Sequence, residues 1–440
     1  MRTTYLCLIC LLGLTACGDD FTLLAPESQR NAQTYYDQPT DMEVALNGVY
    51  DALQLAGTYS QSYWIMLEMR SDNTDQGADV TGLARELAVI NDFQEIPTSE
   101  FVGNAWTDSY KGINRANTLL ARLDDVEMDA ARKERIRGEA LFLRSLFYYN
   151  LAVLFGNIPL VLEETRSPNQ PFEQVPASRI YQQIIADLQA AAERLPASYS
   201  GADIGRATKG AALTLLGKVY LTTGDKGTAA QVLRRVVDEF DYQLVENYAD
   251  LWGPQNENNV ESIFEVQYKA GGIGEGSPFT DTFDAQNRPT PDLIAAYEAG
   301  DLRKAASITE EGFCAKFPSD PFSQFDADNN FPVLRYADVL LMLAEALGES
   351  PEAYALINQV RARAGLAPID DSTPGTFTEK LLHERQVELA FENHRWPDLL
   401  RFGVAESRMA AQGLQARPLF PIPQREIDVA PDVMTQNPGF

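Results

Sequence analysis

Apolar residues recur at three- and four-residue intervals through much of the chain. Trp106, Tyr110 and Ile113 follow this spacing, which predicts a helix with one face toward a core. Short charged or glycine-containing turns separate such stretches, so neighbouring helices are expected to pack antiparallel. Helix, tight turn and helix, repeated along a chain, are typical of a tetratricopeptide-like helical-repeat scaffold. The predicted helical hairpins occupy mainly residues 41–56, 104–240 and 334–393.

Two signals define the helices near the C-terminal end. Leu334–Leu347 is strongly apolar and is followed by Gly348, which predicts a buried helix with glycine just past its end. Thr376 with Glu379 forms a capping-box signature, in which each residue satisfies a free backbone N–H of the other. We therefore expect a last long helix that continues through Glu392.

Two stretches lack the helical spacing. Residues 59–103 and 241–333 are rich in glycine, proline, aspartate and asparagine, which predicts long loops, and such loops often carry function. Within the second stretch, residues 261–268 alternate polar and apolar side chains, as expected of one strand. The predicted fold class is therefore mainly α, with a loop-rich irregular region and minor β.

The N-terminal seventeen residues indicate export. A short apolar run follows the positive charge of Arg2 and falls short of the ~20 residues that cross a bilayer, which is typical of a secretion signal. Leu14-Thr15-Ala16-Cys17 resembles a bacterial lipobox, which implies cleavage after residue 16 and acylation of Cys17. The alternative is a simple secretion signal with a chance cysteine. We expect a signal peptide over 1–16, a lipidated tether over 17–40 and one domain over 41–440.

The composition excludes several kinds of chemistry. Acidic residues outnumber basic ones by 63 to 36, for a net charge of −27, which argues against nucleic acid as a partner. His383 and His394 are the only histidines, which disfavours histidine-based metal sites and catalytic triads. Beyond Cys17, only Cys314 remains, so no intrachain disulfide is expected. We expect neither a cofactor nor a metal.

Several segments resemble the signatures of the SusD/RagB-like family of nutrient-binding outer-membrane lipoproteins. They occur in the family's order and together span most of the chain. These segments are Asp41–Leu53, Trp106–Asn117, Gly138–Tyr149, Phe155–Leu160, Leu334–Ala346, Glu384–Leu399 and Gln436–Phe440.

The resemblance implies a tetratricopeptide-like frame with irregular loops laid over it. It implies a lipid-anchored protein at the outer membrane that faces the cell surface, with a TonB-dependent barrel transporter as its partner. It also implies capture of glycan, or in some members of peptide, before import, without enzymatic activity. This chain is shorter than many members of the family, so the resemblance leaves the identity of the ligand open.

A glycan site is expected where exposed loops carry flat aromatic rings beside planar polar groups. The rings pack against sugar faces, and the polar groups bond to hydroxyls. The alternative for the loop tryptophans is core packing, which is also what we expect of Trp106 and Trp396. The candidate contacts are Tyr63, Trp64, Arg70, Asp72 and Asn73 in the first loop-rich stretch, and Trp252, Asn256, Phe279 and Phe283 in the second.

Glu384, Glu388 and Glu392 follow one another at four-residue intervals and would share one face of a helix. A pair of carboxylates can hydrolyse glycosides, but the two must face each other across a cleft. We therefore expect a structural ion-pair network in place of catalysis. The arginines expected to neutralise the glutamates are Arg385, Arg395 and Arg401.

One segment matches the first half of a calcium-binding loop, at Asp326, Asp328 and Asn330. Phe331 stands where the loop needs glycine, and Ala337 stands where it needs a bidentate glutamate. We expect a turn that precedes the next helix.

Three function classes therefore remain. The first is a surface lipoprotein that binds glycan and delivers it to a TonB-dependent transporter. The second is a helical-repeat lipoprotein that binds only proteins, and the third is an α-helical glycosidase. Incubation with polysaccharides distinguishes them, since a binder retains the polymer and an enzyme releases reducing ends.

Overall fold

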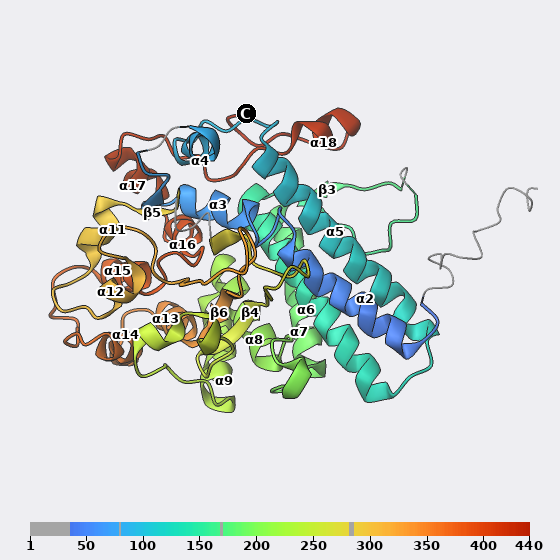
Figure 1. Cartoon of the computed structure of the whole chain (residues 1–440), viewed down its shortest axis with the longest axis horizontal. Helices are drawn as coiled ribbons and strands as arrows, with labels where there is room; N and C mark the ends of the chain where they lie inside the picture. Colours follow the sequence, from blue (N-terminus) through green and yellow to red (C-terminus); the bar gives the residue numbers. More distant parts are fainter. Residues whose placement is uncertain (1–35, 79–80, 168–169, 281–285) are drawn as a thin grey trace, which may run out of the picture.

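The computed structural model describes residues 36–78, 81–167, 170–280 and 286–440 (Figure 1). The predicted signal, the acylation site Cys17 and the candidate contact Phe283 lie outside the described residues. Within the described ranges, no helix combines the length and the apolar composition that crossing a membrane requires.

Helices dominate the described chain, as the apolar spacing predicts, and the mainly α fold class is confirmed. The N-terminal helices are α2 (Pro39–Asp51), α3 (Ser62–Met69), α4 (Gly82–Asn91), α5 (Glu100–Arg122), α6 (Ala130–Phe155), α7 (Ala177–Arg194), α8 (Lys209–Thr222) and α9 (Lys226–Glu239). The C-terminal helices are α11 (Pro291–Ala296), α12 (Arg303–Ser307), α13 (Tyr336–Leu347), α14 (Pro351–Arg363), α15 (Phe377–Glu388), α16 (Arg395–Arg401), α17 (Ala405–Ala411) and α18 (Gln424–Val429).

The helices gather on two flanks of the molecule. Figure 1 shows α2, α5, α6 and α7 side by side on the right, and α11 to α15 on the left. Loops drawn in yellow and orange, between α9 and α13, cross the middle of the view. One hydrophobic cluster extends from Met42 to Met434 and so links the two flanks.

The hairpin of α5 and α6 shows how local sequence sets the helix ends. Asp129 caps α6 because its carboxylate accepts the backbone N–H of Arg132 at 2.9 Å. Gly156 follows the last residue of α6 with a φ of 70°, a left-handed conformation that glycine adopts without strain. The two helices approach closely at Gly112, where an added Cβ would lie 2.4 Å from the ring of Phe147.

Replacing Gly112 by alanine is therefore expected to lower the free energy of unfolding by about 1–3 kcal/mol, because the buried Phe147 ring would have to shift. Gly103 lies on the same helix with open space at its Cβ position. Gly103→Ala should instead raise stability by about 0.5–1 kcal/mol through helix propensity. Chemical denaturation of both variants measures the difference, and equal effects would contradict the close packing of α5 on α6.

The strands form three antiparallel pairs, β1–β5, β2–β3 and β4–β6. They are β1 (Thr74–Asp75), β2 (Ile158–Pro159), β3 (Gln174–Val175), β4 (Ser262–Val266), β5 (Arg288–Pro289) and β6 (Phe331–Arg335). The strand predicted within 261–268 is confirmed as β4. Its partner β6 includes Leu334 and Arg335, so the helix predicted from Leu334 begins two residues later. The β1–β5 pair joins the two loop-rich stretches, which the sequence left unconnected.

The prediction of loops over the whole of 59–103 and 241–333 was wrong in part, since α3, α4, α11 and α12 lie there. Every residue of α3 is buried. A helix that is covered on all sides has no polar face, so its sequence lacks the helical alternation of apolar and polar residues that would reveal it.

The predicted helix through Glu392 was also wrong, because α15 ends at Glu388. The backbone carbonyl of Glu388 accepts hydrogen bonds from side chains of distant segments and not from a further helical turn. The donors are Tyr248 Oη and Arg335 Nη2, each at 2.7 Å. The chain then turns through Phe391 and Asn393, whose φ angles of 67° and 64° are left-handed. Glu392 therefore lies in a turn and does not share a helix face with the other glutamates.

Candidate functional site

The first candidate contacts lie inside the protein. Tyr63 and Trp64 are buried in α3. Arg70 is also fully buried, with its guanidinium 3.9 Å from the ring centroid of Phe420 and paired with Glu95. Burial lowers the pKa of Arg70 to about 10, although Glu95 opposes the shift.

Asp72 and Asn73 connect distant parts of the fold. The carboxylate of Asp72 accepts two hydrogen bonds from Arg395, at 2.5 and 2.7 Å. The side-chain oxygen of Asn73 accepts a bond from Gln386 at 2.9 Å. The backbone carbonyls of both residues accept bonds from Thr290, each at 2.8 Å. These contacts hold the first loop-rich stretch against α11, α15 and α16.

The second group of candidates forms an aromatic cluster under the loops. Trp252 is buried with the ammonium of Lys316 4.6 Å from its ring centroid, and half-buried Asn256 donates to the carbonyl of Trp252 at 2.8 Å. Phe279 is fully buried, and its ring centroid lies 5.1 Å from that of Phe317. A sugar cannot stack on a ring that other side chains cover, so burial favours core packing for the aromatic candidates of both groups.

Glu384 and Glu388 of α15, and Glu392 in the turn after it, belong to a buried ion-pair network, as predicted. The predicted partners were wrong, because the neutralising residues come from other elements. Glu384 pairs with Arg303 and Arg361, Glu388 with Arg303, Arg335 and Arg363, and Glu392 with Arg335 and Lys316. Arg385 pairs with Asp338 and Asp398, Arg395 with Asp72, and Arg401 with Glu345 and Asp398.

The network keeps the carboxylates of Glu388 and Glu392 ionised. Burial by itself would raise the pKa of Glu388, but the charges of Arg363, Arg335 and Arg303 outweigh it and lower that pKa well below its usual value. The pKa of Glu392 is lowered in the same way. A general acid needs a raised pKa, so these carboxylates are suited to structure and not to glycoside hydrolysis.

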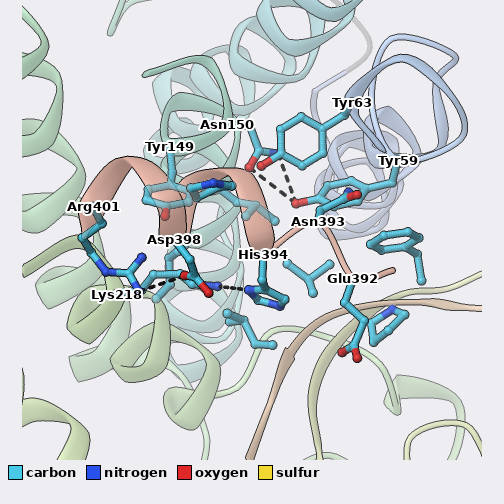
Figure 2. Close-up of a pocket in the computed structure, with 17 residues that line it drawn as sticks. Tyr59, Tyr63, Tyr149, Asn150, Lys218, Glu392, Asn393, His394, Asp398 and Arg401 are labelled. Carbon is cyan, nitrogen blue, oxygen red and sulfur yellow. Dashed lines mark hydrogen bonds and ion pairs between the residues drawn. The ribbon is translucent and has the colours of Figure 1, made fainter. Parts of the chain in front are cut away.

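The interior cavity beside this network is too small for a sugar. Figure 2 shows Tyr59, Asn150, Lys218 and His394 around it, with the ammonium of Lys218 3.1 Å from Nδ1 of His394. Its volume is about 40 Å³, and one water occupies ~10–15 Å³ on this measure. The side-chain amide of Asn393 lines the cavity and forms no hydrogen bond with any residue that the structure describes, so the cavity suits a few water molecules.

Two neighbouring surface segments carry exposed apolar side chains. We call residues 269–276 and 318–328 the loop face. Its most exposed apolar side chains are Phe322 at 68%, Ile273 at 65% and Phe325 at 51%. Exposed aromatic rings are the kind of side chain that can pack against a sugar.

Acidic side chains hold the two segments of the loop face together. The carboxylate of Asp326 accepts the backbone N–H of Gly272 at 2.7 Å. Asp328 accepts the backbone N–H of Ala270 and the ammonium of Lys269, both at 2.9 Å. Through these bonds the segment predicted as a turn anchors the neighbouring loop. In the part of the chain that the structure describes, no group of three His, Cys, Asp or Glu side chains could hold a metal ion.

Sequence reasoning missed Phe322 and Phe325, although a signal was present. Both follow Pro318 and Pro321 in a loop that is otherwise polar, a setting that favours exposed side chains. The predicted aromatic contacts Tyr63, Trp64, Trp252 and Phe279 instead lie in the core.

Comparisons with known proteins agree with this fold. The profile described as SusD family matches residues 309–418, and the profile described as starch-binding associating with outer membrane matches residues 25–221. SusD-like protein P2 of Formosa agariphila is 27% identical, with 98% of each chain covered.

Solved structures extend the likeness over nearly the whole chain. A laminarin-binding SusD-like protein is 31% identical, covers 92% of this chain and 100% of its own, and has a TM-score of 0.84. Surface glycan-binding protein A from Bacteroides fluxus has a TM-score of 0.81 over 91% of this chain and 99% of its own, but at 24% identity it supports the fold alone. With its helical frame, its two profile matches and a full-length relative at 31% identity, this chain belongs to the SusD/RagB-like family.

Proposed function

We propose that this protein binds glycan at the cell surface and delivers it to a TonB-dependent transporter of the outer membrane. The observation that carries the proposal is the 31% identity to a laminarin-binding SusD-like protein over the whole of that chain. The family description that matches residues 25–221 names starch binding and association with the outer membrane. Both observations favour carbohydrate as the ligand class.

The loop face is the proposed glycan site. Phe322 and Phe325 present exposed rings on residues 318–328, and the carboxylates of Asp326 and Asp328 hold this segment against residues 269–276. A pre-formed aromatic surface binds without a large loss of conformational freedom. The buried candidates such as Trp252 and Phe279 would then support the loops from below.

Attachment and partner complete the proposal. Acylation of Cys17 would hold the protein at the outer face of the outer membrane, since several acyl chains give stable anchoring. A barrel transporter in the same membrane would receive the glycan. The high negative charge of the chain opposes nucleic acid as a ligand.

Electrophoresis in gels that contain polysaccharide tests the proposal. Laminarin is the first polymer to try, followed by a panel of other glucans, xylans and mannans. The protein should be retarded without release of reducing ends. Phe322→Ala with Phe325→Ala should weaken binding by about 10- to 100-fold, because two stacking surfaces are lost.

Val44→Ala on α2 is the matched control, because Val44 is also an exposed apolar side chain but lies outside the loop face. It should leave retardation unchanged. Release of reducing ends would favour the glycosidase alternative. Absence of retardation across the panel would favour the protein-interaction alternative and refute glycan binding.

A further inference from the structure

A second pocket lies among the helices drawn on the right of Figure 1, and none of its lining residues belongs to the loop face. It is bounded by α5, by residues 159–167 and 170–172, and by α18; Figure 1 shows α18 beside the end of α5. Its volume of about 450 Å³ falls within the ~300–1,000 Å³ typical of sites for small ligands. It shares no lining residue with the interior cavity of Figure 2.

Aromatic rings form one wall of this pocket. Trp106 and Tyr110 lie one helical turn apart on α5, with ring centroids separated by 5.2 Å, and half-buried Phe172 also lines the pocket. The hydroxyl of Tyr110 donates to the carbonyl of Pro159 at 2.7 Å. Trp106 is only 4% exposed and packs on Phe155 at 5.2 Å, so it supports the wall from behind, and the half-buried rings of Tyr110 and Phe172 are the ones that a sugar could contact. The wall is therefore fixed before any ligand arrives.

Hydrogen-bond donors and acceptors both face the same pocket. The half-buried carboxylate of Glu426 forms no hydrogen bond or ion pair with any residue that the structure describes, and burial raises its pKa. Asn114 uses its oxygen to accept the backbone N–H of Thr165 at 3.1 Å, which leaves its amide N–H groups as donors. Arg425, beside Glu426, adds a cation at the rim.

The aromatic wall, the donors and the acceptor together indicate the chemical class of ligand that the pocket would bind. Sugars carry hydroxyls that both donate and accept, and they stack on aromatic rings. A purely apolar ligand would bury Glu426 without a hydrogen bond, which is unfavourable. A polyanion would meet Glu426 and the net charge of −27.

We propose that this pocket is a second glycan-binding site, which takes a short oligosaccharide segment. It rests on the proposed function, because it assumes that the protein binds carbohydrate. A long polysaccharide could then occupy the loop face and this pocket as two separate sites. Binding at two sites on one protein raises the overall affinity for a polymer above that for a short oligosaccharide.

Calorimetric titration with laminarihexaose, and with short oligosaccharides of any polymer that retards the protein, tests the inference. The starting protein carries Phe322→Ala and Phe325→Ala, so that binding at the loop face is weakened. It should retain saturable binding with one site per chain. Adding Glu426→Gln or Phe172→Ala should weaken that binding about tenfold or more.

Tryptophan fluorescence supplies a second readout. Trp106 lines this pocket, whereas Trp64, Trp252 and Trp396 are buried elsewhere. Oligosaccharide should therefore change the emission, and Trp106→Phe should abolish the change while it preserves most of the calorimetric binding. Val44→Ala remains the control and should alter neither readout.

The possible failures are distinguishable. If the unmodified protein binds glycan but Glu426→Gln and Phe172→Ala leave affinity and stoichiometry unchanged, the second site is refuted and the proposed function stands. If the unmodified protein binds no glycan of the panel, both proposals are refuted.

Discussion

Replacing Arg335 by methionine is expected to lower the free energy of unfolding by about 3–5 kcal/mol, because it leaves buried carboxylates without their partner. The guanidinium of Arg335 lies 2.7 Å from Glu261, 2.6 Å from Glu388 and 2.6 Å from Glu392. All four side chains are almost completely buried. Arg335 therefore joins β6, the segment before β4, and the turn after α15.

Guanidinium denaturation of the Arg335→Met protein at pH 7 measures the loss. Arg235→Met is the matched control, because Arg235 pairs with Glu239 at 2.8 Å on the exposed face of α9. A solvent-exposed pair of this kind contributes about 0–1 kcal/mol. Losses of equal size in the two variants would contradict the inference that the buried network stabilises the C-terminal half.

Replacing His394 by glutamine is expected to make the protein markedly less sensitive to mild acid. Burial, aided by the charge of Lys218, lowers the pKa of His394 to about 3 from its usual 6.5. Below pH 6.5 the unfolded chain therefore binds a proton that the folded protein rejects. Above pH 6.5, His394 is neutral in both the folded and the unfolded protein, and its titration costs no stability. As the pH falls from 6.5 toward 3, the free energy of unfolding decreases by about 1.4 kcal/mol per pH unit.

Denaturation curves at pH 7 and pH 5 measure this effect as a difference between wild type and His394→Gln. Wild type should lose about 2 kcal/mol more than the variant between the two pH values. Glu68, whose pKa burial raises to about 7, changes stability in the opposite sense, but it is present in both proteins and cancels in the difference.

His383→Gln makes the same replacement of a ring by an amide at a partly exposed position. It reports what the replacement of a ring by an amide does to stability at a position outside the buried network. A His394→Gln protein as acid-sensitive as wild type would show that His394 is not held neutral in the fold.

The sequence predicted the parts of the fold that depend on neighbours along the chain. The spacing of Trp106, Tyr110 and Ile113 gave α5, and Thr376 with Glu379 gave the start of α15. These features are local, because a helix period and a cap involve residues within a few positions of each other. The loop-rich middle was also predicted, although α3 was missed because it has no polar face.

The candidate site was predicted less well, because exposure is a tertiary property. Trp64 and Phe279 have the chemistry of sugar contacts, yet other segments cover both rings. Phe322 and Phe325 remain exposed because Asp326 and Asp328 hold their loop against residues 269–276. Loop composition does not reveal which ring faces water.

By itself, the sequence determined the helical frame, the order of its hairpins, the family resemblance and the acidic character of the surface. Only the tertiary structure decided where α15 ends, which arginine meets which glutamate, and which aromatic rings line a pocket. Glu388 and Arg335 are 53 residues apart, yet their side chains bond at 2.6 Å. Contacts across such separations depend on how whole elements pack, and the period of a single helix carries no information about them.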